Sequence, residues 1–210
     1  MRRLLVSAII VAVLGLPLLS HGAIWDIDPA HTSAQFAVRH LMVSTVRGEF
    51  SKVSGTVNLD EQDPTKSSLE ATIDTASINT RVEKRDQHLK SPDFLDVAKY
   101  PTIAFKSKKI EKVSDTKFKV TGDLTLHGVT KEVVLDVEGS TKAAKDPSGN
   151  LRIGGMATTK INRQDFGVQW NKALETGGVV VGDEVAITID VELTKKAEPT
   201  AAASGTTSPN

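Results

Sequence analysis

The stretch VAITIDVEL, residues 185–193, places an apolar side chain at every second position from Val185 to Leu193. Successive side chains of a β-strand point to opposite faces of a sheet, so this alternation predicts a strand with one buried face. The same period, in segments rich in Val, Ile and Thr, recurs upstream at residues 34–40, 53–59, 69–73, 103–105, 118–126, 133–137 and 153–161.

The segments between these predicted strands contain Gly, Asp, Asn, Ser or Pro, as turns do, and the clearest hairpin turn is DPSGN at 146–150. About eight short strands at regular spacing are typical of a β-sandwich or an antiparallel barrel. The chain has no cysteine and so lacks the Cys–Trp–Cys pattern of immunoglobulin domains. Gly55, Gly122 and Gly155 lie in the predicted inward-facing runs, where glycine suits tight bends and close approach to a ligand. Both observations favour the barrel.

One segment, at about residues 80–97, departs from the β pattern. Thr80 to Glu83 fits a capping box, and the residues through Lys90 are good helix formers. Ser91-Pro92-Asp93 then fits a second cap with proline at the first helical position, opening a short turn through Val97. The sequence therefore predicts one helical insertion between two blocks of strands, placed to cover a barrel mouth.

The two ends of the chain differ in composition from the predicted barrel domain at 24–194. Residues 1–22 carry Arg2 and Arg3 directly after Met1, continue with an apolar run and end with small residues, which predicts a secretory signal peptide. The apolar run is shorter than the roughly 20 residues of a membrane-spanning helix, so a membrane anchor is the weaker interpretation. Residues 197–210 contain Ala, Ser, Thr, Pro and Gly without a large apolar side chain, which predicts a disordered tail.

The overall charge excludes some functions. Twenty-six basic residues balance 26 acidic ones, and no basic run concentrates charge, so nucleic-acid binding is not expected. The lack of cysteine excludes a disulfide framework and a lipid attached through cysteine, so we expect a mature protein that is soluble rather than membrane-anchored.

Several local motifs follow one another along the chain: IDPAHTS (27–33), FAVRHLM (36–42), GEF (48–50), SINT (77–80), RDQHL (85–89), SPDFLD (91–96), KYP (99–101), GDLTLHGVT (122–130) and INRQDFGV (161–168). In this order they resemble the YceI-like family of polyisoprenoid-binding proteins, and the resemblance covers residues 24–193.

This resemblance implies an all-β, extended, lipocalin-like antiparallel barrel with a long apolar channel. It also implies isoprenoid ligands such as polyprenyl phosphates or quinone-like molecules, and in some relatives fatty amides. Members are typically exported to the bacterial periplasm, in agreement with the signal peptide predicted independently.

A polar cluster is predicted near the helical insertion. Arg81, Arg85 and His88 share one face of the expected helix, at i, i+4 and i+7, and Arg163 of the INRQDFGV motif is the expected partner of Asp86. On the functional interpretation, Arg85, His88 and Arg163 meet a polar or phosphate head group at the channel mouth. On the structural alternative, Arg85 and Arg163 form an ion-pair network with Asp86 and Asp165 that pins the helix to the barrel.

The histidines give weaker signals. His31 and His40 are assigned to the first long strand, where His40 shares the face of Phe36 and Val38 and could meet a ligand head or be an ordinary core histidine. His127, beside Gly128, is predicted to be a turn residue. No close histidine pair suggests a metal site, no Gly-x-Ser-x-Gly elbow suggests a hydrolase, and no cofactor is predicted.

The complete set of predicted ligand-binding residues combines channel-lining and head-group candidates. Large apolar side chains suit contact with an aliphatic ligand, although packing in the core is the alternative for each of them. The predicted set is Phe36, Val38, His40, Arg85, His88, Phe94, Phe105, Arg163, Asp165, Phe166 and Trp170.

The sequence thus predicts a periplasmic binding barrel for a long isoprenoid or similar lipid, used for transport, storage or stress protection. One alternative is an enzyme acting on a prenyl or quinone-like substrate with His88 or His40 as general base. Another is a structural β-domain whose own side chains fill the interior. A homodimer would be reasonable for a barrel with exposed strand edges.

Overall fold

The computed structural model describes residues 22–140, 142–175 and 177–195. Eight strands of this part form a closed antiparallel barrel, in which each strand pairs with its neighbours and the pairing of β11 with β12 closes the cylinder. In barrel order the strands are β1 (Ala23–Ile27), β4 (Val53–Leu59), β5 (Ser68–Asp74), β7 (Thr102–Lys112), β8 (Lys117–Leu126), β9 (Val129–Gly139), β11 (Leu151–Asn162) and β12 (Val181–Lys195). The predicted antiparallel barrel is confirmed.

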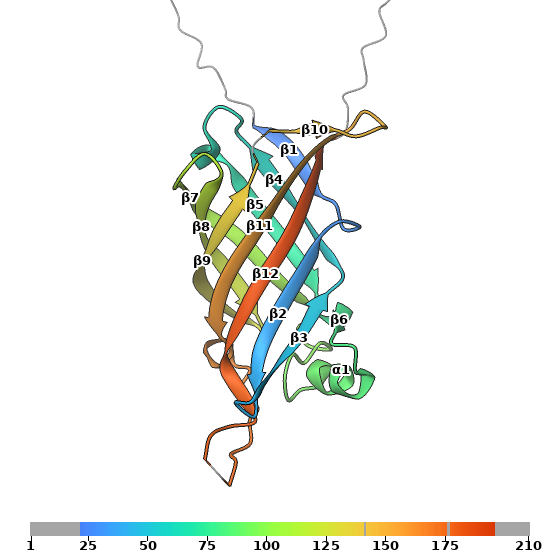
Figure 1. Cartoon of the computed structure of the whole chain (residues 1–210), viewed down its shortest axis with the longest axis vertical. Helices are drawn as coiled ribbons and strands as arrows, with labels where there is room; N and C mark the ends of the chain where they lie inside the picture. Colours follow the sequence, from blue (N-terminus) through green and yellow to red (C-terminus); the bar gives the residue numbers. More distant parts are fainter. Residues whose placement is uncertain (1–21, 141, 176, 196–210) are drawn as a thin grey trace, which may run out of the picture.

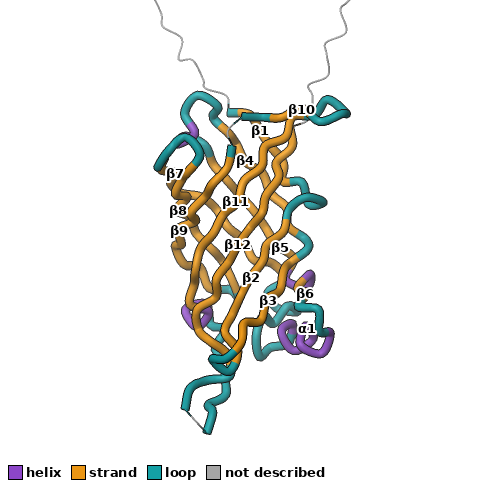
Figure 2. Tube along the Cα trace, in the orientation of Figure 1, coloured by secondary structure: helices purple, strands orange, loops and turns teal. Residues whose placement is uncertain are grey.

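The barrel is tall, and its two ends differ (Figure 1). At one end, called here the β10 end, β10 (Ala144–Lys145) pairs with the start of β11. At the other, called here the α1 end, β2 (Ser33–His40), β3 (Ser44–Phe50) and β6 (Ile78–Asn79) extend the sheet from β12. The helix α1 (Glu83–Lys90) lies beside them, and Figure 2 shows how little helix the barrel contains. Three short 3₁₀ helices complete the described part: η1 (Pro64–Lys66), η2 (Thr75–Ser77) and η3 (Arg163–Phe166).

The alternating segment at 185–193 lies in β12, the longest strand. Its apolar side chains face inward. They lie beside inward-facing residues of the neighbouring strand β11, where Val185 pairs with Ile161 and Ile189 pairs with Ala157. The burial of one face along every strand is what makes the period-two pattern in the sequence.

Two glycines let aromatic rings lie close against the barrel wall. A Cβ atom at Gly122 would lie 2.5 Å from Cζ of Phe105, and one at Gly48 would lie 2.5 Å from Cζ of Phe36. A side chain at either position would collide with the ring, so glycine permits this close packing.

The helical insertion differs from its prediction in two details. Helix α1 ends at Lys90 as expected, but its N-cap is Val82, which makes no side-chain cap. The Thr80 hydroxyl instead donates to the Asp86 carboxylate at 2.5 Å, and the Thr80 amide donates to the same oxygen at 2.8 Å. The capping box was therefore wrong, because Asp86 folds back over Thr80. Residues 91–97 form turns and no second helical turn.

The remaining local predictions concern one turn, two histidines and the two ends of the chain. The turn at 146–150 is confirmed by a bond from the Asp146 amide to the Asn150 carbonyl. His127 lies in a turn, as predicted, whereas His31 precedes β2 and lies in a bend, because the strand begins only at Ser33. The predicted signal peptide, except Gly22, and the predicted tail lie outside the described residues. Within the residues described, no helix is long and apolar enough to cross a membrane.

Candidate functional site

A cavity of about 390 Å³ follows the axis of the barrel. Its lining reaches from Leu59 and Leu193 at the β10 end to Val38 and Val181 at the α1 end. Almost every side chain that lines it is apolar and aliphatic or aromatic. The volume lies in the range of about 300–1,000 Å³ that ligand sites occupy, and the shape suits a long, thin, apolar molecule.

Five of the predicted ligand-binding residues line this cavity. Phe36 and Phe105 do so as rings laid against the wall, Val38 from β2, Phe94 from the turns after α1, and Arg163 from η3. They come from separate segments of the chain, and the closure of the barrel brings them around one interior.

Arg163 is the one charged residue among the described residues that line the cavity, and its side chain is only 5 % exposed. Its Nε donates to the Gly182 carbonyl at 2.9 Å, and its Nη1 donates to the carbonyls of Val168 and Trp170 at 2.6 and 3.0 Å. A guanidinium has five N–H donors. The other two bonds run from Nη2, to the Val181 carbonyl and the Asp183 carboxylate, at 3.3 and 3.2 Å.

All donors of Arg163 are thus bound to the protein. Burial lowers the pKa of this guanidinium, and the nearby Asp183 carboxylate opposes that shift. The residue holds the chain after η3 against the start of β12, and a ligand head group would have to replace one of these partners. We define this arrangement of Arg163 with its four carbonyls and Asp183 as the carbonyl cradle.

The predicted pairing of Arg163 with Asp86 was wrong. Asp86 binds Thr80, and Arg85 donates to the Thr80 hydroxyl and carbonyl at 2.8 and 2.9 Å. The alternative network that joined Arg85, Asp86, Arg163 and Asp165 is not formed either, because Arg163 has its partners on the barrel side. The local Thr80 contacts and the carbonyl cradle satisfy the two groups separately.

Three aromatic side chains meet at the α1 end. The ring centroids of His88 and Phe94 are 5.0 Å apart, and Trp170 lies 5.1 Å from each of them. His88 also pairs with Asp93 at 2.9 Å. Since Phe94 also lines the cavity, this aromatic cluster forms part of the cover at the α1 end.

The other predicted site residues lie outside the cavity lining. Phe166 is buried in the core, Asp165 is exposed and His40 is half-buried at the end of β2. Arg85 and His88 are on α1, and Trp170 reaches the site only through the aromatic cluster. As ligand contacts, these residues stay predictions.

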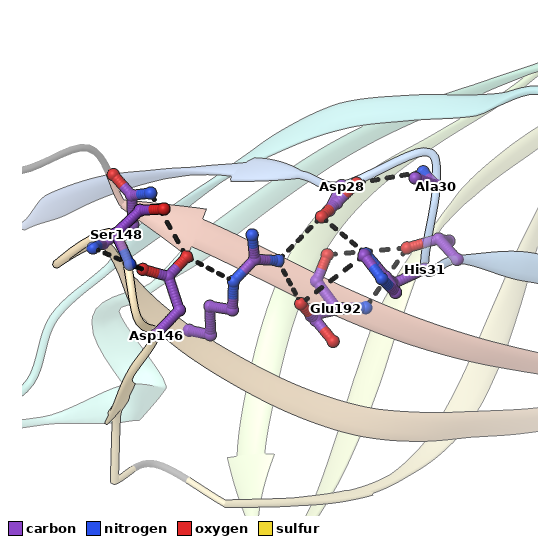
Figure 3. A network of polar contacts seen from close by, with 9 residues as sticks. Asp28, Ala30, His31, Asp146, Ser148 and Glu192 are labelled. Carbon is purple, nitrogen blue, oxygen red and sulfur yellow. Dashed lines mark hydrogen bonds and ion pairs between the residues drawn. The ribbon is translucent and has the colours of Figure 1, made fainter.

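The β10 end carries a second polar network, which the sequence did not predict (Figure 3). Arg152 binds Asp28 at 2.8 Å, Asp146 at 2.9 Å and also Glu192, and His31 binds Asp28 at 2.9 Å. We call these five residues the carboxylate latch. It ties the turn after β10 to the bend between β1 and β2.

The charges of the latch shift one another's pKa values. Hydrogen bonds from His31 and Arg152 hold the pKa of Asp28 well below its usual range, and Arg152 lowers that of Asp146 to about 2. The carboxylates of Asp28, Asp146 and Glu192 in turn raise the pKa of Arg152. Donor atoms of Asp28, His31 and Glu192 lie within 4.8 Å of one another, but a metal ion there would have to displace the Arg152 guanidinium from two carboxylates.

Comparisons with known proteins give a consistent family match. The sequence model of the YceI-like domain matches residues 25–193. The "UPF0312 protein SA2479" of Staphylococcus aureus (strain N315) is 40% identical over 165 residues, which are 79% of this chain and 94% of that protein.

Solved structures share the fold. The crystal structure of the Campylobacter jejuni YCEI protein has a TM-score of 0.63 at 36% identity, covering 76% of this chain and 90% of that one. A polyisoprenoid binding domain from Saccharophagus degradans has a TM-score of 0.60 at 14% identity, covering 82% and 98%. At that identity the second likeness shows the fold alone.

Proposed function

The chain belongs to the YceI-like domain family, and on that premise we propose that it binds a long apolar lipid of the isoprenoid class along the barrel axis. The observation that carries the proposal is the elongated cavity of about 390 Å³ with its almost wholly apolar lining. A solved barrel of the same fold is described as a polyisoprenoid binding domain, which agrees with the proposal.

The driving force for such binding is the removal of the lipid chain from water. Each buried CH₂ contributes about 0.8 kcal/mol, so a few isoprene units give a gross gain comparable with the roughly 4–15 kcal/mol that association costs. Affinity therefore does not require a strong polar contact. We propose that Phe36, Val38, Phe94 and Phe105 contact the apolar chain, since all four line the cavity.

A binding role is favoured over a catalytic one by the position of the histidines. Neither His40 nor His88, the two residues considered as general bases, lines the cavity, and His88 pairs with Asp93. We further propose that the protein acts in the periplasm in lipid transport, storage or stress protection. That part of the proposal rests on the predicted signal peptide.

Two adjacent valines of β9 provide a matched test. Val133 lines the cavity, whereas Val134 is 43 % exposed and lies outside the lining. We expect Val133→Glu to lose retention of farnesol and of a longer polyprenol, because a carboxylate inside the cavity is desolvated by an apolar ligand. Val134→Glu should retain both, as measured by extraction and mass spectrometry of the loaded protein.

A second variant without a charge keeps the test valid if Val133→Glu unfolds the barrel. Val133→Phe keeps the interior apolar and fills part of the cavity, so it should fold and retain less of the longer polyprenol than the wild type. Equal retention by the wild type and both folded Val133 variants would overturn the proposed binding site.

A further inference from the structure

The turn that joins β2 to β3, at the α1 end, has an unusual backbone. The Val43 amide donates to the His40 carbonyl at 3.1 Å, and the two central residues have positive φ values, 51° at Leu41 and 60° at Met42. Tight hairpin turns with positive φ at both positions favour Asn-Gly, because bulky side chains are strained in this region. Here both positions carry large apolar side chains.

Burial does not compensate this strain. The exposed fractions are 37 % for Leu41, 52 % for Met42 and 78 % for Val43, so three consecutive apolar side chains face solvent. The backbone is instead held from behind, since Arg39 donates to the Met42 carbonyl at 2.6 Å and to the Thr45 hydroxyl at 3.1 Å. A braced, strained turn that presents apolar groups to water indicates a use outside the folded domain.

The position of the turn relates it to the cavity. Figure 1 shows the β2–β3 turn at the end of the barrel opposite β10, beside the segment that leads into β12. The Leu41 amide donates to the Val180 carbonyl at 2.8 Å, and Val38 and Val181, close to these two residues, line the cavity. We call Leu41, Met42 and Val43 the apolar tip.

We propose that the apolar tip inserts into the surface of a lipid bilayer and sets the α1 end of the cavity against the membrane. This inference rests on the proposed function, because an apolar cargo that moves between bilayer and barrel needs such an approach. The tip has three residues, whereas a stable protein interface buries roughly 20–30 residues a side. Binding at a membrane surface strengthens with the apolar area that is buried and with the attraction of nearby cations to anionic lipids.

The charges beside the tip fit the same occupant. Arg39 and Lys172 are exposed and have no carboxylate partner among the described residues, so they can approach lipid phosphates. Glu175 is the acid of the neighbouring hairpin, whose strands meet at the bridge between Ala173 and Val179. Asp183, which is 45 % exposed beside Gly182, is paired with Arg163 and forms a neutral pair with it. The local balance of the remaining charges is positive.

The test is flotation of the full protein with vesicles of phosphatidylcholine containing a minority of phosphatidylglycerol. Leu41→Asn combined with Met42→Gly removes two apolar side chains and also relaxes the turn, so this variant should fold at least as well as the wild type. We expect its vesicle partition coefficient to fall at least tenfold, and that of Val43→Asp to fall similarly. The matched control is Val113→Asp, since Val113 is 60 % exposed in the turn between β7 and β8, at the β10 end.

Each outcome decides the proposal. Loss of flotation in both tip variants with retention in Val113→Asp supports it. Equal flotation of all variants, or none by the wild type, overturns it, as does a wild-type dimer that the tip variants make monomeric. Lipid extracted from the same samples tests the proposed function separately, because neither tip variant alters a residue that lines the cavity.

Discussion

Two arginines at opposite ends of β11 stabilise the barrel through different kinds of partner. Arg152 lies at its start, in the carboxylate latch, and binds three carboxylates while 29 % of its side chain stays exposed. Arg163 follows its last residue, in the carbonyl cradle, where it binds four backbone carbonyls and one carboxylate with 5 % exposed.

The different partners of Arg152 and Arg163 show that different forces stabilise the two ends of the barrel. The latch consists of full charges partly open to water, so salt and acid should weaken it. The cradle consists mainly of carbonyl dipoles in a buried site, where an uncompensated group would be costly whatever the salt concentration. The β10 end should therefore respond to solution conditions, and the α1 end should not.

Removal of the cradle arginine should have the largest effect. Arg163→Ala removes the guanidinium donors from the carbonyls of Val168, Trp170 and Gly182, whereas the Val181 carbonyl keeps the bond from the Asn171 side-chain amide. We expect the free energy of unfolding to fall by about 3–5 kcal/mol. Urea unfolding followed by circular dichroism measures it. Arg163→Lys, which keeps the charge with three donors, should lose about 1–3 kcal/mol. If Arg163→Ala lowered the free energy of unfolding by less than about 1 kcal/mol, the carbonyl cradle would not be what stabilises the α1 end.

Removal of the latch arginine should have a smaller effect that depends on salt. Arg152→Ala should lower the urea midpoint less than Arg163→Ala does, because its partners can be hydrated by water. The difference from the wild type should shrink at about 1 M NaCl, where the Debye length is only about 3 Å. The difference caused by Arg163→Ala should persist there. Equal salt dependence of the two variants would contradict the assignment of different forces to the two ends.

The pH dependence sharpens the same contrast. The pKa of Asp146 falls from 3.8 to about 2 in the folded protein, so its contribution to stability is present above pH 3.8 and is lost as the pH falls through about 2. The gap in melting temperature between the wild type and Arg152→Ala should be constant above about pH 5 and should narrow toward pH 2. A gap of the same size at pH 2 and pH 7 would show that Asp146 does not contribute to it.

The smallest effect on stability is expected from the substitution of His31, at the exposed edge of the carboxylate latch. His31 is the most exposed latch member, and Asp28 keeps bonds from Arg152 and the Ala30 amide without it. His31→Gln should therefore leave the melting temperature nearly unchanged at pH 7. If it matched Arg152→Ala in effect, His31 and not Arg152 would be the centre of the latch.

The strands could be predicted because burial of one face produces a pattern within each short segment of sequence. One-sided burial produces a period of two in β8, β11 and β12, and this pattern was enough to predict the barrel. The helix through Lys90 could be predicted from its helix-forming residues. The capping box failed because Thr80 had a better acceptor in Asp86, one turn further along the chain.

The polar contacts could not be predicted because they depend on strand register and on backbone atoms. The cradle uses carbonyls, which every residue carries and which no side-chain pattern marks. The latch joins Asp28, Asp146, Arg152 and Glu192 from separate segments, and only the IDPAHTS motif and the turn at 146–150 were visible locally. The cavity-lining role of Phe36 and Phe105 depends on glycines of other strands.

Native mass spectrometry of the protein purified from a bacterial host, followed by solvent extraction, tests the central claim most directly. A barrel with an apolar cavity of about 390 Å³ is expected to carry a lipid of defined mass, or to take up a polyprenol, a polyprenyl phosphate or a quinone on incubation. Release of that lipid on denaturation would identify its chemical class. A spectrum that stays ligand-free after incubation with all three would contradict the proposal that this barrel is a lipid carrier.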